Sequence, residues 1–265
     1  MPCFRDSASA VNLIWLDAVD STNDWADRLI AAALEADETS LPDTVLVATT
    51  QSGGRGRGAN RWVSPPGGLY ATWFAWIPVE TLQVLPLAVA VACAEAVEAL
   101  LSGVSVGLKW PNDLVVGGRK LGGILAQARG AGDAVWVRVG FGINVAVTPV
   151  LASGDPVRPV SLAELGWKGD VEQAARALVN AFVRHVRPAL TDPERTRERW
   201  QARLVHRPGE RMRVRLETAV VDCRFVGLTP EGHLEVEVDG RLERIVAGEL
   251  VPRSEDDGGD HAPDA

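Results

Sequence analysis

Residues 51–65, QSGGRGRGANRWVSP, decide how the rest of the chain is interpreted. They follow the apolar run VLVA at residues 45–48, so a buried strand is expected to deliver a loop in which glycines alternate with two arginines. Glycine lets backbone N–H groups approach a ligand closely, and arginine offers a permanently charged fork for carboxylate or phosphate oxygens. The pattern predicts an anion-binding loop. A solvated surface hairpin explains it equally well, so the remaining sequence has to decide.

The composition is that of an ordinary globular protein. The chain has 265 residues, of which 46% are hydrophobic and 23% charged, enough for one good core and a small second domain. No uncharged apolar run reaches the ~20 residues of a membrane helix, and residues 1–10 lack the apolar segment of a signal peptide. We therefore expect a soluble cytoplasmic protein without a membrane partner.

The charge balance argues against a protein that binds nucleic acid by neutralising phosphates, because the net charge is −8. Half of this charge lies in residues 253–265, which contain one arginine and five acidic residues. The three cysteines, Cys3, Cys93 and Cys223, have no metal-binding spacing and cannot all pair with one another. We expect them to be reduced thiols without a special role.

Hydrophobic periodicity predicts a layered domain of strands and helices, of the α/β or α+β class. Strands are expected at residues 11–19, 69–77, 104–108 and 134–145, and helices at residues 20–36, 84–101, from Asp170 onwards and 193–204. The first helix is expected to bury Trp25, Leu29, Ala32 and Ala33, with Ser21 or Thr22 as its cap. Asp170 and Gln173 predict a capping box for the third helix, and the fourth is expected at the surface.

The sequence pattern changes at residue 206. Short alternating strands are expected at residues 211–216, 219–227, 233–238 and 241–246, with Asp239-Gly240 as a tight hairpin turn. We therefore predict a catalytic or binding domain over residues 1–205, a small β-barrel over residues 206–252 and a disordered acidic tail over residues 253–265.

Four further motifs lie where strands are expected to end. DSTN at residues 20–23 opens the first helix, and capping alone accounts for its Ser, Thr and Asn. The other motifs are KWPNDL at residues 109–114, GRKLGGIL at residues 118–125 and GFGINV at residues 140–145. Each alone is ordinary turn chemistry. Together, because each combines glycine with cations or amides, they predict the walls of one anion site.

These four motifs and the glycine-rich loop, in the order in which they occur along the chain, closely resemble the catalytic domain of biotin protein ligases over residues 11–147. Enzymes of that family activate biotin with ATP and attach it to a lysine of an acceptor protein. Three positions depart from the common bacterial pattern. Ala59-Asn60 stands before Arg61-Trp62 where Gly-Arg is common, and Gln127 stands where an acid is common.

The resemblance implies a fold and partners that composition does not. The fold is a mixed sheet with flanking helices, like that of class II aminoacyl-tRNA synthetases, followed by a small SH3-like barrel. The acceptor is a biotin carboxyl carrier protein domain of an acyl-CoA carboxylase. Only about ten residues precede the first expected strand, too few for a helix-turn-helix domain, so we expect a ligase without DNA as a partner. The oligomeric state stays open.

The resemblance also implies which residues meet biotin. Hydrogen bonds to the ureido ring are assigned to Ser21, Thr22, Asn23 and Gln51, and close backbone approach to Gly122, Gly123 and Gly140. The loop residues Gly54, Arg55, Gly56 and Arg57 complete this set with Lys120, Arg55 by steadying the loop. The ATP contacts are Arg57, Asn60, Trp62, Lys109, Asn112, Lys120 and Asn144. Mg²⁺ accompanies the triphosphate, with Asn112 or Asp113 nearby, and Trp62 either walls the site or packs.

The reaction explains why cations are needed. The biotin carboxylate must attack the α-phosphorus of ATP, and two like charges ~4 Å apart repel by ~4 kcal/mol at an effective dielectric near 20. Arg57 and Lys120 are the candidates for bridging these anions. The acceptor lysine is protonated near neutral pH and needs a proton acceptor, for which Asp113 is the candidate. A turn carboxylate that binds its own backbone is an equally good explanation of Asp113.

Two other functions stay open at this stage. A lipoate ligase shares the fold and reaction type with a different acyl group. A non-enzymatic RNA-binding module would use the Arg-Gly loop, although the acidic charge balance disfavours it.

Overall fold

The computed structural model describes residues 11–38, 41–58, 60–150 and 158–251. The chain forms two compact units that divide between Val205 and His206, where the sequence pattern changes. Residues 253–265, for which disorder was predicted, and Cys3 lie outside the described residues. No described helix is long and apolar enough to cross a membrane.

A seven-stranded sheet forms the framework of the N-terminal unit, in the order β1-β2-β3-β7-β6-β5-β4. β1 and β2 are parallel, and all other neighbouring strands are antiparallel. In sheet order the strands are β1 Asn12–Val19, β2 Thr44–Gln51, β3 Gly68–Pro78, β7 Ala134–Asn144, β6 Arg119–Arg129, β5 Asp113–Val116 and β4 Gly107–Lys109. The sheet is therefore mixed, as the resemblance implied.

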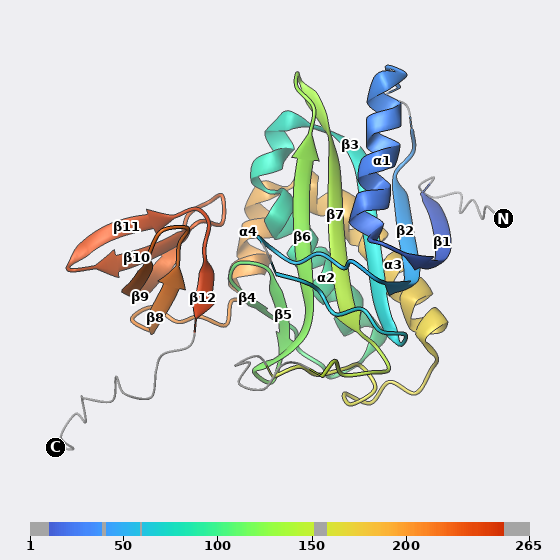
Figure 1. The fold of residues 1–265 in the computed structure, drawn as a ribbon. Coiled ribbons are helices and arrows are strands. Elements are labelled where there is room, and N and C mark those ends of the chain that lie inside the picture. The colour runs from blue at the N-terminus through green and yellow to red at the C-terminus, as the bar shows by residue number, and fades with distance from the viewer. Residues whose placement is uncertain (1–10, 39–40, 59, 151–157, 252–265) are drawn as a thin grey trace. The chain divides into compact units, whose positions relative to one another are not determined.

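Helices cover both faces of this sheet. Figure 1 shows α1 in front of it and α2, α3 and α4 behind it. Their bounds are α1 Thr22–Glu35, α2 Leu85–Leu100, α3 Val171–Thr191 and α4 Pro193–Gln201, with a short 3-10 helix, η1 Val79–Gln83, before α2. The α+β class expected from the sequence is confirmed.

Neighbouring residues of β3 point to opposite layers, as the period of a strand requires. Trp73 meets Phe182 of α3 edge-on, with 5.9 Å between ring centroids. Phe74 lies in the opposite cluster with Ile30 of α1 and Trp136 of β7. The two faces of the sheet therefore have separate cores, and the face under α1 is the one that leads to the motifs.

The buried face of α1 differs from the predicted one. Thr22, Asn23, Ala26, Ile30 and Ala33 are buried, whereas two predicted core residues, Trp25 and Ala32, are exposed. The prediction followed apolar residues only, but two polar residues begin the inward face and so shift its register. The predicted capping role is wrong as well, because Ser21 occupies the N-cap position without a side-chain capping hydrogen bond.

Other expected elements are present with small changes. The capping box of Asp170 and Gln173 opens α3, and α2 is almost entirely buried with Pro86 in its first turn. α4 lies at the surface, with Thr196 and Trp200 as its buried residues. The strand expected at residues 104–108 is the shorter β4, because its partner β5 pairs with it only from Val115 to Asp113.

The C-terminal unit is a five-stranded antiparallel sheet in the order β11-β10-β9-β8-β12. Its strands are β8 Arg211–Arg215, β9 Val220–Leu228, β10 Leu234–Val238, β11 Arg241–Ile245 and β12 Glu249–Val251. Val214, Phe225 and Val236 form part of its core. Asp239 and Gly240 both have positive φ, 49° and 75°, which confirms the predicted tight turn. Closure of this sheet into a barrel stays a prediction.

Candidate active site

Strand pairing brings the motif-bearing strand ends to one end of the sheet. The end of β1 pairs with the end of β2 at Gln51, and the start of β3 pairs with the end of β7 at Asn144. The start of β6 follows, where Gly123 pairs with Gly142, and then the start of β5, where Asp113 pairs with Gly123. Segments as far apart in the sequence as Gly68 and Asn144 therefore lie side by side, as the prediction of a single site requires.

β7 supplies the floor of this site through its alternating pattern. Its residues on the α1 side are large at one end, where Trp136 packs in the core and Arg138 pairs with Asp27. Towards the motif end they become Gly140 and Gly142. Because these positions have no side chain, groups from other segments can approach the strand closely there.

Protein side chains occupy the space over these glycines. A Cβ at Gly140 would lie 2.5 Å from Asn23 Nδ2, and a Cβ at Gly142 would lie 2.5 Å from Trp62 Nε1. Similarly, a Cβ at Gly123 would lie 3.1 Å from the Trp62 ring, and a Cβ at Gly122 2.5 Å from the carbonyl oxygen of Gly142. Close approach at Gly122, Gly123 and Gly140 was predicted for a ligand. In this structure the groups that approach are Asn23, Trp62 and the neighbouring strand.

A buried polar network joins the start of α1 to the end of β2. The backbone N–H of Thr22 donates to Gln51 Oε1 at 2.8 Å, and the Thr22 hydroxyl donates to the same oxygen at 3.1 Å. The Thr72 hydroxyl lies 2.8 Å from Thr22 Oγ1 and 3.0 Å from Asn23 Oδ1. Gln51 Nε2 donates to Ser64 Oγ at 2.9 Å. These side chains hold each other in place, so their polar atoms are oriented before any ligand is considered.

Sequence reasoning found part of this network and missed the rest. Ser21, Thr22, Asn23 and Gln51 were predicted, and the first three are buried. Thr72 was missed because it lies in the apolar strand 69–77. The available signal was a small hydroxyl-bearing side chain among mostly apolar neighbours. A hydroxyl in such a run needs a partner inside the protein.

The glycine-rich loop is fixed at its base by the β1–α1 corner. The N–H of Ser52 donates to Val19 O at 2.9 Å, and the N–H of Gly53 donates to Asp20 O at 2.7 Å. The Asp20 carboxylate binds the Arg28 fork, which holds the pKa of that carboxyl at about 2, with help from the Ser21 N–H. The Asp20 carboxylate is therefore ionised at neutral pH.

Arg55 extends this attachment to α1. Its Nε lies 2.8 Å from Asp24 Oδ1, and both side chains are partly exposed. Arg55 also faces Arg61 in an isolated β-bridge, and the N–H of Trp62 donates to Gly54 O at 3.0 Å. The two sides of the loop are therefore paired, and α1 holds one of them. The role of Arg55 in steadying the loop over bound biotin stays a prediction.

Trp62 carries the loop across the sheet. Figure 1 shows the segment between β2 and β3 running in front of β7 and β6. The indole lies on Gly123 and Gly142, and Lys120 Nζ lies 5.5 Å from the ring centroid. The indole N–H is buried and has no hydrogen-bond partner among the described residues. The indole packs against the strand floor, and its contact with ATP stays a prediction.

Lys120 and Asp113 form an ion pair beside this tryptophan. Lys120 Nζ lies 2.7 Å from Asp113 Oδ1, and the side chains are 24% and 17% exposed. The residues lie near the starts of β6 and β5, which Gly117 and Gly118 join with positive φ angles of 56° and 75°. Asp113 was expected to bind its own backbone or to act on a lysine of the acceptor. The lysine that it contacts here is Lys120.

The predicted nucleotide-binding amides lie at the same end of the sheet but bond to the main chain. Asn112 Nδ2 donates to Ile124 O at 2.7 Å, and Asn144 Nδ2 donates to Val160 O at 3.0 Å. Lys109 is at the end of β4, where it pairs with Asp113. The other predicted loop residues are the half-buried Gly56 and Arg57 and the exposed Asn60. Contacts of these residues with ATP stay predictions.

The unusual residue Gln127 has a clear place in the structure. Arg138 Nε donates to Gln127 Oε1 at 3.1 Å, while another nitrogen of the same guanidinium binds Asp27. A neutral acceptor suffices here because Asp27 already supplies a negative charge. Among the described residues, no group of three His, Cys, Asp or Glu side chains could hold a metal ion.

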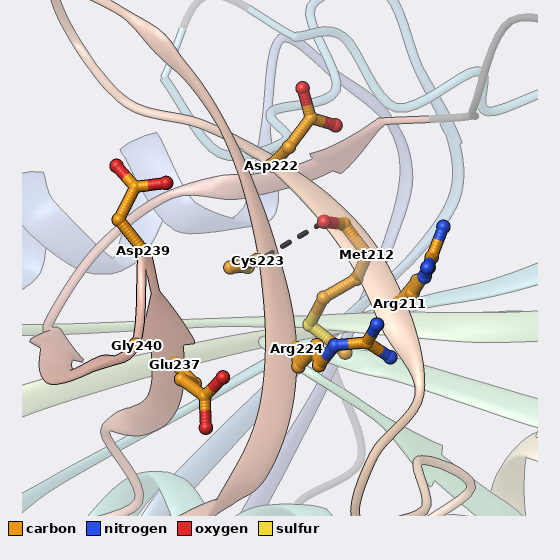
Figure 2. Close-up of a pocket in the computed structure, with 8 residues that line it drawn as sticks. All are labelled: Arg211, Met212, Asp222, Cys223, Arg224, Glu237, Asp239 and Gly240. Atoms are coloured by element: carbon orange, nitrogen blue, oxygen red, sulfur yellow. Dashed lines mark hydrogen bonds between the residues drawn. The ribbon is translucent and has the colours of Figure 1, made fainter. Parts of the chain in front are cut away.

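A separate cleft of about 470 Å³ lies in the C-terminal unit. Figure 2 shows its lining, in which the Arg211 and Arg224 guanidiniums and three carboxylates surround Cys223 and Met212. The Cys223 thiol donates to Met212 O at 3.6 Å, and burial raises its pKa to about 11. A thiol with a raised pKa is a poor nucleophile. None of the five motifs contributes to this cleft.

Comparisons with known proteins agree with the motifs. The model of the biotin/lipoate A/B protein ligase family matches residues 16–144. A biotin–[acetyl-CoA-carboxylase] ligase of Paracoccus denitrificans is 30% identical, and the alignment covers 89% of this chain and 98% of that protein.

Two solved structures are similar over nearly the same length. A biotin protein ligase from Aquifex aeolicus, in complex with biotin and ATP, has a TM-score of 0.67 and 26% identity, covering 91% of this chain and 99% of that one. A biotin protein ligase from Leishmania major, in complex with biotinyl-5-AMP, has a TM-score of 0.57 and 27% identity, covering 89% and 98%. This chain belongs to the biotin/lipoate A/B protein ligase family, and its resemblance to biotin protein ligases is confirmed.

Proposed function

We propose that this chain activates biotin with ATP to biotinyl-5'-AMP and then transfers biotin to a lysine of a biotin carboxyl carrier protein domain. The observation that carries the proposal is the meeting of five motifs on one face, at one end of one sheet. A polar network, a glycine floor and a cation lie there together. The relatives named as biotin ligases support the same reaction.

In the first half-reaction a carboxylate oxygen of biotin attacks the α-phosphorus of ATP. The bond from that phosphorus to the bridging oxygen breaks, and pyrophosphate leaves with its electron pair. Lys120 and Arg57 neutralise the charge that gathers between the two anions. Lys120 suits this role because its ammonium is only partly exposed, so its attraction for an anion is weakly screened.

The buried network supplies the other end of the biotin site. Ser21, Thr22, Asn23 and Gln51 combine donors and acceptors within one small region, which fits a ureido group that is itself both donor and acceptor. Because Gln51 and Thr22 are bonded to one another, the site is preorganised and little ordering entropy remains to be lost on binding. The Arg55, Gly54 and Gly56 segment closes over the ligand.

The ATP contacts are Arg57, Asn60, Trp62, Lys109, Asn112, Lys120 and Asn144. Magnesium binds oxygen ligands and retains several waters, so phosphate oxygens and water hold most of its coordination sphere. Asn112 or Asp113 would add one oxygen.

In the second half-reaction the amine of the acceptor lysine attacks the carbonyl carbon of the mixed anhydride. The amide bond forms, AMP leaves, and the proton of the amine passes to a base. Asp113 serves as that base or orients the amine. The observation that supports this role is its ion pair with Lys120, in which Lys120 Nζ lies 2.7 Å from Asp113 Oδ1.

The remaining assignments follow the family. The acceptor is the carrier domain of an acyl-CoA carboxylase, the enzyme acts in the cytoplasm, and the five-stranded C-terminal sheet is an SH3-like barrel. The N-terminal sheet is of the class II aminoacyl-tRNA-synthetase type.

Pyrophosphate release from ATP tests the function. The purified chain is mixed with ATP, Mg²⁺ and either biotin, lipoate or RNA, and pyrophosphate is measured. Release with biotin, followed by labelling of a carrier domain, is the expected result. Release with lipoate alone would identify a lipoate ligase. Release with neither acid, combined with binding of RNA, would contradict the enzyme.

A further inference from the structure

The start of β6 extends past the end of its neighbour β7. The last paired positions are Gly122 with Ile143, and β7 ends at Asn144. Lys120 therefore lies where β7 no longer provides a partner. A strand residue without a neighbour leaves its N–H and C=O groups to be satisfied in another way.

A crossing segment, residues 158–164, takes the place of β7 at this point. The N–H of Lys120 donates to Arg158 O at 2.7 Å, and the N–H of Val160 donates to Lys120 O at 2.9 Å. Residue 159 thus forms a parallel bridge with Lys120. Both main-chain polar groups of Lys120 bind this segment, so the segment determines where the Lys120 backbone lies.

The crossing segment is itself attached to the end of β7. The N–H of Leu162 donates to Asn144 O at 2.9 Å, and Val160, Ser161 and Leu162 are buried. The Asn144 side chain donates to Val160 O at 3.0 Å. This attachment fixes the segment along the sheet but leaves its outer edge to be held by other groups.

Arg119 and Glu164 hold that outer edge. The Arg119 fork donates to Pro159 O from Nε at 3.1 Å and from Nη2 at 2.8 Å, and Nη2 lies 2.6 Å from Glu164 Oε2. Glu164 also accepts from the Thr148 hydroxyl, and these two donors lower the pKa of its carboxyl. The guanidinium thus connects the residue next to Lys120 with both the bridge residue and the end of the segment.

We propose that Arg119 and Glu164 are positioning residues, which act through the crossing segment to place the Lys120 ammonium between the biotin carboxylate and the α-phosphate. This inference rests on the proposed function. Misplacement of a reacting group by about 1 Å can cost about a hundredfold in rate, so a main-chain support has a kinetic effect much larger than its contribution to stability. An exposed ion pair contributes little to stability by itself.

The test measures single-turnover formation of biotinyl-adenylate and the affinities for biotin and ATP. Arg119→Ala is expected to slow adenylate formation about tenfold and to change both affinities less than about twofold. Arg119→Lys, which retains the charge and loses the fork, is expected to fall between Arg119→Ala and the unchanged chain. Glu164→Gln is expected to slow the reaction about threefold.

Two comparisons separate positioning from general damage. In a Lys120→Ala background, Arg119→Ala is expected to have no further effect, because the group that it positions is absent. Arg176→Ala is the matched control, since Arg176 and Glu172 form a partly exposed ion pair of similar length, 2.7 Å, on α3. It is expected to leave the rate unchanged. An equal loss from Arg119→Ala with and without Lys120, or an equal loss from Arg176→Ala, would overturn the inference.

Hydrogen exchange provides a readout that does not depend on activity. Exchange of the Lys120 and Val160 amides is expected to be about tenfold faster in Arg119→Ala, because both N–H groups bond within the bridge. Unchanged exchange at both amides would also overturn the inference. If the unchanged chain makes no adenylate from biotin, the proposed function itself fails. If it does, and the variants miss the expected pattern, only the positioning roles fail.

Discussion

The glycine-rich loop and the β5–β6 hairpin bring cations to the same end of the sheet, but they are held in different ways. The loop is attached at its base by two main-chain hydrogen bonds, on one side by the partly exposed Arg55–Asp24 pair, and over the sheet by the Trp62 indole. The hairpin has a ladder on each side of β6, and the crossing segment continues the support at Lys120. The comparison suggests that the group needing an accurate position is on the ladder, and the group that closes over a ligand is on the loop.

The strongest test of the hairpin removes its cation. Lys120→Ala is expected to reduce the rate of biotinyl-adenylate formation by about 10²–10³-fold, because a preorganised charge acts mainly in the transition state. ATP affinity is expected to change far less. Rapid-quench formation of adenylate and equilibrium binding of ATP measure the two quantities. Equal losses in rate and in ATP affinity would remove Lys120 from the transition state.

A second substitution on the hairpin addresses the other half-reaction. Asp113→Asn keeps the shape and removes the charge, so adenylate is expected to form while its transfer to the carrier lysine slows about a hundredfold. Single-turnover transfer from preformed biotinyl-adenylate provides the measurement. Transfer at the unchanged rate would mean that Asp113 serves Lys120 alone.

A substitution in the glycine floor of β7 tests whether the loop or the sheet moves to make room. In Gly142→Ala the new Cβ would lie 2.5 Å from Trp62 Nε1, so either the indole or the strand must move. Such overpacking costs about 1–3 kcal/mol where the neighbouring groups cannot move away. Because the loop is held less firmly, we expect Trp62 to move, with biotin affinity falling roughly tenfold and the melting temperature nearly unchanged.

Calorimetry of biotin binding and thermal unfolding check this expectation. Gly227→Ala is the matched control, because its Cβ would have a single neighbour, the end of the Glu235 side chain at 3.8 Å. A large loss of thermal stability in Gly142→Ala, with biotin affinity retained, would show that the strand yields instead.

The smallest effect is expected on the loop itself. Asp24→Asn removes the charge partner of Arg55, and an exposed pair contributes at most about 1 kcal/mol. Biotin affinity is expected to fall about two- to fivefold, and the difference should shrink at high salt because such pairs are screened. Hydrogen exchange over residues 52–60 should be slowed by biotin in the unchanged chain and less so in this variant. Exchange that biotin does not alter would contradict a loop that closes on its ligand.

Sequence reasoning succeeded where local chemistry fixes local structure. The Asp239-Gly240 turn and the Asp170 capping box were both readable, because each needs particular residue types at fixed positions. The positions of the five motifs at strand ends were readable for the same reason. Their meeting at one end of the sheet was predicted, and the pairing registers bear it out.

Contacts between distant segments were harder to predict. Thr72 was hidden in an apolar run, and the buried face of α1 was misplaced because Thr22 and Asn23 are polar. The crossing segment binds Lys120 through main-chain atoms, so its residue types carry no direct signal. Trp62 was recognised as a wall or a packing residue, but its contact with Gly142 depends on a loop path that no local pattern defines.

The alternation along β7 has a consequence for redesign of this protein. Residues such as Val139 and Phe141 face the layer of α3, whereas Gly140 and Gly142 form the floor on which Asn23 and Trp62 rest. Alternate residues of β7 therefore serve different purposes: one set contributes to the stability of the fold, and the other set shapes the proposed biotin site. A library could vary only the floor glycines and the side chains that rest on them, Asn23 and Trp62. Such a library could be screened for variants that use biotin analogues with altered rings, and it would leave the core under α3 unchanged. Selection for higher thermal stability would instead act on the residues of β7 that face the layer of α3.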